Sequence, residues 1–368
     1  MAKTVYVGMS GGVDSSVSAL LLKEQGYKVV GIYMKNWSKD LPGMKCPWAE
    51  DLADAKRVAV KLGIDFEVWD FEEAYREKVV EYMLREFKAG NTPNPDIMCN
   101  QEIKFKLFYE KAMEKGADFI ATGHYARVID GKLARAVDEN KDQTYFLYRI
   151  SEEALTHTLF PIGGMTKPEV KKLAEEKGLH NAYKKESMGV CFVGEVGMKD
   201  FLKEYIDAEP GEIREIETEK VLGYHEGAIF YTIGQRHGLY IAAEVPYYVV
   251  KKDIKKNVVY VSKNLNNGEL WTSELRLEDL LLRFGAFRSA AARELAPAAR
   301  GDGPAGRGPE RSGRALSVLV RLRHRAPLIP AILDGNTLHF EHEIKRPASG
   351  QSAVLYDGEI CLGGGIIA

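Results

Sequence analysis

The sequence lacks the features that would place a protein in a membrane or outside the cell. No stretch of the 368 residues approaches the roughly 18 uninterrupted apolar residues of a membrane span, and the first residues show no apolar signal-peptide core. The four cysteines, Cys46, Cys99, Cys191 and Cys361, are widely separated and form no CxxC pair. These absences weigh against a secreted disulfide scaffold and a structural zinc site. We therefore expect a cytoplasmic protein.

An excess of charge of one sign is also missing. With 51 Lys+Arg against 53 Asp+Glu, the net charge of −2 argues against indiscriminate nucleic-acid binding but leaves room for a local basic surface. One segment departs from this balance: Arg283 to Arg325 holds ten arginines against three acidic residues, and no lysine occurs between Lys263 and Lys345. We interpret residues 283–317 as a disordered linker or surface insertion, with a basic RNA-binding arm or a corrupted reading frame as alternatives.

Strand and helix signals alternate along residues 1–150. We expect strands at 4–9, 28–33, 66–69 and 118–122, and helices at 14–25, 50–62, 72–88 and 102–115. This alternation is typical of an α/β domain with a parallel sheet covered by helices on both faces. Ligands of such folds bind beyond the carboxyl ends of the strands. Residues 122–124, Thr-Gly-His, follow one expected strand and a glycine-rich stretch follows another.

The remainder of the chain changes character twice. Residues 151–208 predict a small, mainly helical central domain that carries Cys191. Residues 209–368 read as short strands and turns and predict a C-terminal β-barrel domain.

The glycine-rich stretch is "SGGVDSS", residues 10–16, at an expected strand-to-helix junction. Glycines let backbone N–H groups converge on an anion, and a helix N-terminus adds unpaired donors with partial positive charge. Asp14 caps the helix or helps to hold a metal beside phosphate. The lysine of the Walker pattern is absent, so the stretch instead matches the SGGxDS loop of ATP pyrophosphatases, which transfer an adenylyl group. A merely capped turn is the alternative.

Two cysteines occupy loop positions suited to chemistry. Cys99 lies near an expected helix start, where a thiolate is favoured, and Asp96 three residues earlier is a proton relay or a turn residue. Cys191 follows a polar loop with Lys184 and Lys185, whose charges also favour thiolate. The other two cysteines read as structural.

Five further segments extend the pattern formed by the glycine-rich loop and the two cysteines: "ATGHYARV", "KDQTYFLYRI", "CFVG", "YTIGQRHGL" and "GQSAVLYDGE". The sequence resembles the bacterial tRNA-specific 2-thiouridylase (tRNA-uridine 2-sulfurtransferase) family of the PP-loop ATP pyrophosphatase superfamily. The resemblance covers nearly the whole chain outside 283–317. It implies an adenine-nucleotide α-hydrolase-like N-terminal domain, an ATP-binding catalytic domain over residues 1–150 and a tRNA-binding barrel over residues 209–368.

The resemblance implies ATP- and persulfide-dependent 2-thiolation of the wobble uridine of tRNA, with release of AMP and pyrophosphate. Cys191 resembles the persulfide carrier, Cys99 its partner, which attacks the activated carbon or releases sulfide, and Asp96 an acid/base. ATP contacts are implied at Gly8, Met9, Ser10, Gly11, Gly12, Val13, Asp14, Ser15, Met34 and Gly123. Contacts with tRNA are implied at Asn94, Pro95, Asp96, His124, Lys141, Asp142, Gln143, Arg321, Leu322 and Gln351.

The implied cofactors and partners follow from this chemistry. ATP comes with Mg²⁺, to which Asp14 is a candidate ligand, and there is no permanently bound cofactor. The expected partners are the anticodon loop of tRNA and a sulfur-relay or cysteine-desulfurase protein, with a monomer as the default. The base must leave its stack to be modified, which is easiest in a single-stranded loop.

Two departures and several alternatives remain. Arg321-Leu322-Arg323 stands where the family often has Arg-Tyr-Arg, and Met188 where many members carry Gln. A sulfurtransferase for another base or a tRNA lysidine-type ligase would share the adenylation step, although amine ligation needs no thiol. A small-molecule amide synthetase would explain neither the cysteines nor the β domain. A non-catalytic tRNA-binding protein would not need an intact ATP loop.

Overall fold

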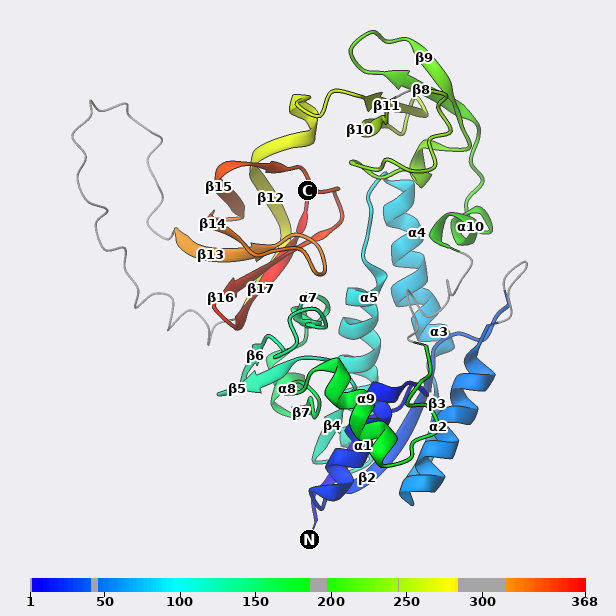
Figure 1. Cartoon of the computed structure of the whole chain (residues 1–368), viewed down its shortest axis with the longest axis vertical. Helices are drawn as coiled ribbons and strands as arrows, with labels where there is room; N and C mark the ends of the chain where they lie inside the picture. Colours follow the sequence, from blue (N-terminus) through cyan, green and yellow to red (C-terminus); the bar gives the residue numbers. More distant parts are fainter. Residues whose placement is uncertain (1, 41–45, 186–196, 244, 284–314) are drawn as a thin grey trace, which may run out of the picture. The chain divides into compact units, whose positions relative to one another are not determined.

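A computed structural model describes residues 2–40, 46–185, 197–243, 245–283 and 315–368 (Figure 1). The chain forms two compact units. Unit 1 comprises residues 1–88 and 93–208, and unit 2 comprises residues 89–92 and 209–368. Within the described residues, no helix has the length and apolar character needed to cross a membrane.

Unit 1 contains the expected parallel sheet. Its strand order is β3-β2-β1-β4-β7, and every neighbouring pair is parallel. The strands are β1 (Thr4–Gly8), β2 (Lys28–Lys35), β3 (Asp65–Asp70), β4 (Phe119–Ala121) and β7 (Thr158–Leu159). Because the chain moves from β1 to one side and later returns to β4 on the other, the order reverses between β1 and β4. Ligands of open α/β sheets bind at such a switch point.

The helices of unit 1 agree with the expected ones within a few residues. An antiparallel hairpin pairs β5 (Arg127–Ile129) with β6 (Lys132–Ala134). Residues 76–80 and 99–107 are π-helical. The α-helices are α1 (Val13–Glu24), α2 (Trp48–Leu62), α3 (Glu72–Tyr75), α4 (Glu81–Lys88), α5 (Pro95–Met98), α6 (Phe108–Glu114), α7 (Thr144–Leu147), α8 (Glu152–Thr156), α9 (Lys167–Glu176) and α10 (Met198–Lys203).

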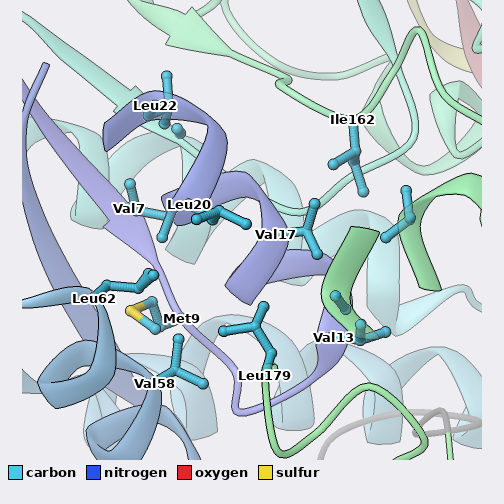
Figure 2. Close-up of a cluster of buried hydrophobic side chains, with 14 of the residues drawn as sticks. Val7, Met9, Val13, Val17, Leu20, Leu22, Val58, Leu62, Ile162 and Leu179 are labelled. Carbon is cyan, nitrogen blue, oxygen red and sulfur yellow. The ribbon is translucent and has the colours of Figure 1, made fainter. Parts of the chain in front are cut away.

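The main core of unit 1 lies between the sheet and helices α1, α2 and α9 (Figure 2). Val7 of β1, Val17 of α1, Val58 of α2 and Val170 of α9 are all completely buried. Burying an aliphatic side chain of this size contributes about 1.5–3 kcal/mol. The core thus fixes α1, and with it the loop that precedes α1, against the sheet.

The region expected as a central domain lies in unit 1. Strand β7 joins the edge of the parallel sheet beside β4, and α9 packs against α1 (Figure 1). The division of the chain at residue 150 stays a prediction. Cys191 and Met188 lie outside the described residues.

Unit 2 contains two β structures where the sequence predicted one small barrel. The first is a four-stranded sheet, β10-β11-β8-β9, around its own small core. The second is a ring of six strands, closed by pairing between β12 and β17. The strands are β8 (Gly211–Glu215), β9 (Val221–His225), β10 (Tyr248–Asp253), β11 (Val258–Ser262), β12 (Trp271–Leu282), β13 (Leu316–Arg321), β14 (Ile329–Asp334), β15 (Thr337–Lys345), β16 (Ser352–Asp357) and β17 (Ile360–Ile367). Most of residues 283–317 lies outside the described residues.

Candidate active site

Glycine is required once in the loop after β1 and once in the segment after β4. Gly11 adopts a φ of +78°, and a Cβ built there would lie 2.4 Å from the backbone oxygen of Asp51. Gly123, after β4, packs against the same loop: its Cβ would lie 2.6 Å from the backbone nitrogen of Ser15. The two segments that flank the switch point are therefore in contact, with no side chain between them.

The start of α1 leaves its backbone N–H groups available. Its N-cap is Gly12, which forms no side-chain capping hydrogen bond, although Ser10 Oγ accepts weakly from its backbone N–H at 3.4 Å. The hydroxyls of Ser15 and Ser16 donate to the Gly12 carbonyl at 3.1 and 2.9 Å. They thus stiffen the turn while the N–H groups of the first helical turn lack intrahelical acceptors. This arrangement suits phosphate oxygens and fits the triphosphate of ATP.

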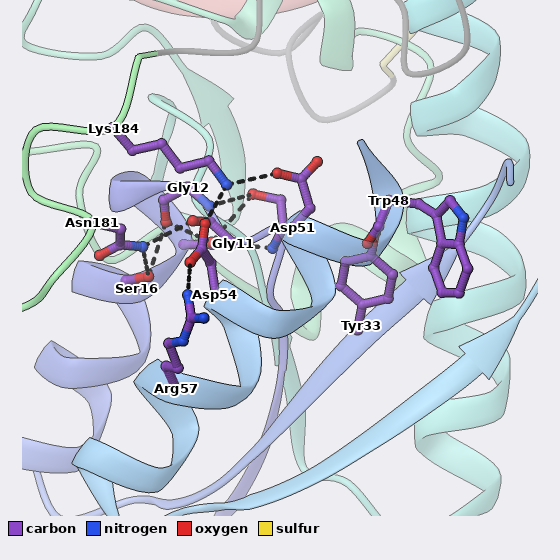
Figure 3. A network of polar contacts seen from close by, with 12 residues as sticks. Gly11, Gly12, Ser16, Tyr33, Trp48, Asp51, Asp54, Arg57, Asn181 and Lys184 are labelled. Atoms are coloured by element: carbon purple, nitrogen blue, oxygen red, sulfur yellow. Dashed lines mark hydrogen bonds and ion pairs between the residues drawn. The ribbon is translucent and has the colours of Figure 1, made fainter. Parts of the chain in front are cut away.

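A network of hydrogen bonds and ion pairs links the glycine-rich loop and α2 to residues 181–184 (Figure 3). Asn181 Nδ2 donates to the Gly11 carbonyl and to Ser16 Oγ, both at 2.9 Å. Lys184 Nζ pairs with Asp51 at 2.7 Å and with Asp54 at 2.6 Å, on α2. Burial opposes ionisation of Asp54, but hydrogen bonds from Lys184 and His180 lower its pKa below the usual value. Residues 181–184 are therefore fixed to both the loop and α2.

Asp14, the first acidic residue of α1, is held by two groups. Lys167 Nζ lies 2.7 and 2.8 Å from its two carboxylate oxygens, and the Tyr125 hydroxyl donates to Oδ1 at 2.9 Å. Lys167 is the first residue of α9 and is only 7% exposed. A buried cation thus stands beside the helix terminus expected to bind phosphate.

The remaining predicted ATP residues separate into backbone and side-chain roles. The side chains of Met9 and Val13 lie in the hydrophobic core, so these residues face a ligand only through their backbone (Figure 2). Met34, near the end of β2, lies over Gly8: a Cβ on Gly8 would be 2.8 Å from Met34 Cε. Replacing either residue would therefore act on the other.

Cys99 begins the π-helical segment 99–107, which continues directly from α5. The thiol-bearing residue is buried, at 3% exposure. Hydrogen bonds in a π-helix join residues five apart, which places Lys104 about one turn after Cys99. No ion pair to Lys104 is found within the described part of the chain. Such segments occur frequently at functional sites.

Two titratable groups close to Lys104 have perturbed pKa values. Burial raises the pKa of Asp96, and the positive charge of Lys104 only partly opposes this effect. Burial lowers the pKa of His124 well below its usual value, and Lys104 lowers it further. The His124 ring packs on Phe105 of the π-helical segment, with centroids 5.8 Å apart. At neutral pH, His124 is therefore uncharged.

Other predicted tRNA residues in unit 1 have structural contacts. Asn94 caps α5, accepting from the backbone nitrogens of Asp96 and Ile97 at 3.2 and 3.4 Å; Pro95, the first residue of α5, is buried. Asp142 is 1% exposed and accepts from Ala136 N and Thr144 Oγ1. Gln143 exchanges hydrogen bonds with the Tyr125 backbone, while the backbone nitrogen of Lys141 donates to Asp138. These contacts shape the segment 141–143, and RNA binding by it stays a prediction.

The predicted tRNA residues of unit 2 are mostly buried. Arg321 is 4% exposed and its guanidinium lies over the Tyr356 ring, 5.5 Å from the centroid, while Leu322 is 8% exposed. Gln351 Nε2 donates to the Thr92 carbonyl at 2.7 Å. Contacts between these residues and tRNA remain a prediction.

The sequence predictions missed Lys104, Lys167 and Asn181 and gave Lys184 only a general role. No local motif marks them. Lys167, Asn181 and Lys184 reach the site through packing with distant segments, and Lys104 lies on the same helical segment as Cys99 without forming a recognised pattern with it. The one available signal was that the glycine-rich loop has no lysine, which indicates that a cation for the phosphate site must come from another segment.

Three family models match the chain. The tRNA methyl transferase HUP domain matches residues 3–195, the tRNA methyl transferase PRC-barrel domain matches residues 199–263, and the aminomethyltransferase beta-barrel domain matches residues 307–367. The two barrel models correspond to the two β structures of unit 2. A solved 4-thiouridine synthetase–RNA complex with bound ATP is similar with a TM-score of 0.38 and 17% identity over 55% of this chain and 50% of that chain, a likeness too low to support an inference.

Curated relatives match over the full length. The tRNA-specific 2-thiouridylase MnmA of Shewanella amazonensis is 46% identical, covering 100% of this chain and 94% of that protein. Those of Bacillus licheniformis and Lysinibacillus sphaericus are 45% and 44% identical, each over 99% of this chain and over 94% and 93% of their own lengths. The chain therefore belongs to the tRNA-specific 2-thiouridylase family.

Proposed function

We propose that the protein is an ATP- and persulfide-dependent sulfurtransferase that thiolates C2 of the wobble uridine of tRNA. One observation carries the proposal: the glycine-rich loop, Gly123 and the helical segment that begins at Cys99 meet at one edge of the sheet. Gly123 touches the loop at Ser15, and the neighbouring His124 packs on Phe105 of the Cys99 segment. An adenylating loop and a thiol-bearing segment are thus joined through two adjacent residues.

The loop supplies activation. A uracil C2 oxygen is a poor leaving group, and transfer of AMP from ATP, with Mg²⁺, converts it into one. The N-terminal N–H groups of α1 suit the pyrophosphate that departs. Pyrophosphate leaves in this step, and AMP leaves when sulfur takes the place of oxygen.

Sulfur arrives as a persulfide on Cys191, loaded by a sulfur-relay or cysteine-desulfurase protein. Either Cys99 attacks Cys191 Sγ of the persulfide, forms the disulfide and releases sulfide, which displaces AMP from C2, or Cys99 itself first displaces AMP from C2. In the second route the outer sulfur of the persulfide displaces Cys99 from C2, and the freed Cys99 thiolate then attacks Cys191 Sγ, which breaks the S–S bond and leaves the sulfur on C2. Both routes break the C2–O bond, form the C2–S bond and end with a Cys99–Cys191 disulfide. A cellular thiol must reduce this disulfide by two electrons before the next turnover.

Asp96 suits proton transfer in this reaction. Burial raises the pKa of its carboxyl, so it keeps a proton at a higher pH than an exposed aspartate does. Such a group serves as an acid to the departing oxygen or as a relay for the Cys99 thiol proton. The neutral ring of His124 and the segment 141–143 serve the tRNA, whose wobble base must be unstacked to reach Cys99.

Mass analysis of tRNA nucleosides tests the proposal. Wild-type protein is incubated with tRNA, ATP, Mg²⁺, a persulfide donor and a thiol reductant, and 2-thiouridine is measured. Cys99→Ser and Cys191→Ser should abolish product, whereas Cys46→Ser, at a half-buried thiol bonded to the Trp37 carbonyl, should not. Thiolation that survives both serine variants would refute the two-cysteine mechanism. Amine incorporation in place of sulfur would support a lysidine-type ligase.

A further inference from the structure

The ion pair between Lys167 and Asp14 is unusual for its position. Lys167 Nζ lies within 2.8 Å of both Asp14 oxygens, in a setting where Lys167 is 7% exposed. Holding a lysine ammonium away from water is costly unless it is paired. This paired lysine lies at the first turn of α1, whose backbone N–H groups lack intrahelical acceptors.

The stability of α9 does not explain this lysine. Lys167 is the first residue of α9, and cations are disfavoured at a helix N-terminus because of the helix dipole. The neighbouring residues instead follow the usual rule: Glu169 accepts from the Thr166 backbone N–H at 2.7 Å in a capping box. The capping box and a hydrogen bond from Lys167 N to Asp138 at 2.9 Å fix the backbone of Lys167. Its side chain is thereby directed toward α1.

We propose that Lys167 supplies the phosphate-binding cation that the loop itself lacks. This inference rests on the proposed use of ATP. In the ligand-free protein, Asp14 holds the ammonium in place, with the Tyr125 hydroxyl fixing the carboxylate. When ATP enters, the ammonium lies beside the N–H groups of the first turn of α1 and donates to phosphate oxygens. Asp14 anchors Lys167 and would also be the carboxylate available to hold the Mg²⁺ that accompanies ATP.

A purely structural ion pair is the competing explanation, and a pair of variants separates the two. Replacing Lys167 alone leaves Asp14 as an uncompensated carboxylate, which repels phosphate even if Lys167 never touches ATP. Asp14→Asn removes that carboxylate. The effect of Lys167→Met in the Asp14→Asn background therefore reports contact between Lys167 and ATP, free of the repulsion.

The experiment measures ATP affinity by titration calorimetry on the full-length protein without tRNA or sulfur donor, with thermal unfolding as a second readout. Asp14→Asn/Lys167→Met should bind ATP about 10- to 100-fold more weakly than Asp14→Asn, the loss expected for one charge-assisted hydrogen bond. Lys167→Met alone should lose more than this, because the uncompensated Asp14 carboxylate adds its repulsion of phosphate. Lys171→Met, at an exposed lysine on the same helix, should bind ATP as the wild type does.

Two results would overturn the proposal: wild-type affinity in Lys167→Met, or affinity in the double variant equal to that of Asp14→Asn. If Lys167→Met fails to fold, the double variant decides, because it leaves no unpaired buried charge. Failure of the proposed function is distinguished by a different measurement, the formation of 2-thiouridine. A wild-type protein that binds ATP but makes no 2-thiouridine leaves the Lys167 result intact, and a Lys167→Met variant with normal ATP affinity leaves the thiolation assay intact.

Discussion

Replacing Gly123 by alanine tests whether the two segments at the switch point must touch. A Cβ at this position would lie 2.6 Å from Ser15 N, 2.8 Å from Asp14 C and 3.0 Å from Ser15 Cα. All three are backbone atoms at the start of α1, so no flexible side chain can give way. Ordinary contact begins at 3.4 Å, and the segments must therefore separate by about 0.8 Å, the difference between 3.4 and 2.6 Å.

The expected consequences are unequal for stability and activity. Overpacking a buried contact costs about 1–3 kcal/mol, which the protein can survive. A displacement approaching 1 Å at a reacting site can cost about 100-fold in rate. We expect Gly123→Ala to unfold at a lower urea concentration and to form AMP with tRNA, ATP and a persulfide donor about 100 times more slowly. Urea titration and quenched-flow measurement of AMP provide the two readouts.

Gly164→Ala is the matched control. A Cβ at Gly164 meets nothing within 4 Å, and the residue is exposed in the same unit. This variant should retain wild-type stability and AMP formation. If Gly123→Ala formed AMP at the wild-type rate, the close approach of Gly123 to the loop would have no part in catalysis.

Three further predictions concern titratable groups. If Asp96 acts as an acid, activity falls as the pH rises through its raised pKa, and Asp96→Asn reduces the thiolation rate about 100-fold or more. Lys104→Met should shift the alkaline limb of the pH–rate profile to higher pH, because it removes a positive charge that lowers the pKa of Asp96. Folding lowers the pKa of His124, so below about pH 6.5 the unfolded chain binds a proton that the folded chain does not. As the pH is lowered below about 6.5, the free energy of unfolding should therefore decrease by up to about 1.4 kcal/mol per pH unit. His124→Gln should flatten this dependence in urea titrations. Burial lowers the pKa of Lys252 from 10.5 to about 8, and its Nζ has no hydrogen-bond partner among the described residues. Lys252→Met should therefore stabilise the protein at pH 7 by up to about 3 kcal/mol. This gain in stability should disappear as the pH rises from about 8 to 10.5, because the lysine is then neutral in both the folded and the unfolded state.

The glycine-rich loop was predictable because its information is local. A strand, two glycines and a serine-rich helix start lie within about one dozen residues, and the strand–helix alternation around them predicts a parallel sheet. Asn181 and Lys167 were not predictable by the same means. Their contacts with Gly11 and Asp14 depend on how later segments pack against α1, across more than 150 residues of chain.

The β region shows the same limit. Short alternating strands predict a small barrel, but the pattern does not say which strands pair. The six-stranded ring closes only because β12 pairs with β17, with Leu277 opposite Ile367, whereas β8 to β11 form a separate sheet with its own core. Pairing between strands about 90 residues apart is set by packing and ring closure, which local periodicity does not encode.

A lysine brought in by another helix changes what stabilises a phosphate site. In a Walker-type loop the cation is part of the loop, so the loop alone can form the site. Here the position of Lys167 depends on the contact between α1 and α9, in which Val17 and Val170 are fully buried. If Lys167 binds ATP as proposed, trimming Val170 alters the ATP site through a core residue that never touches ATP. The hydrophobic core of unit 1 is then part of the nucleotide site, because it holds α9, which carries the cation, against α1, which follows the loop.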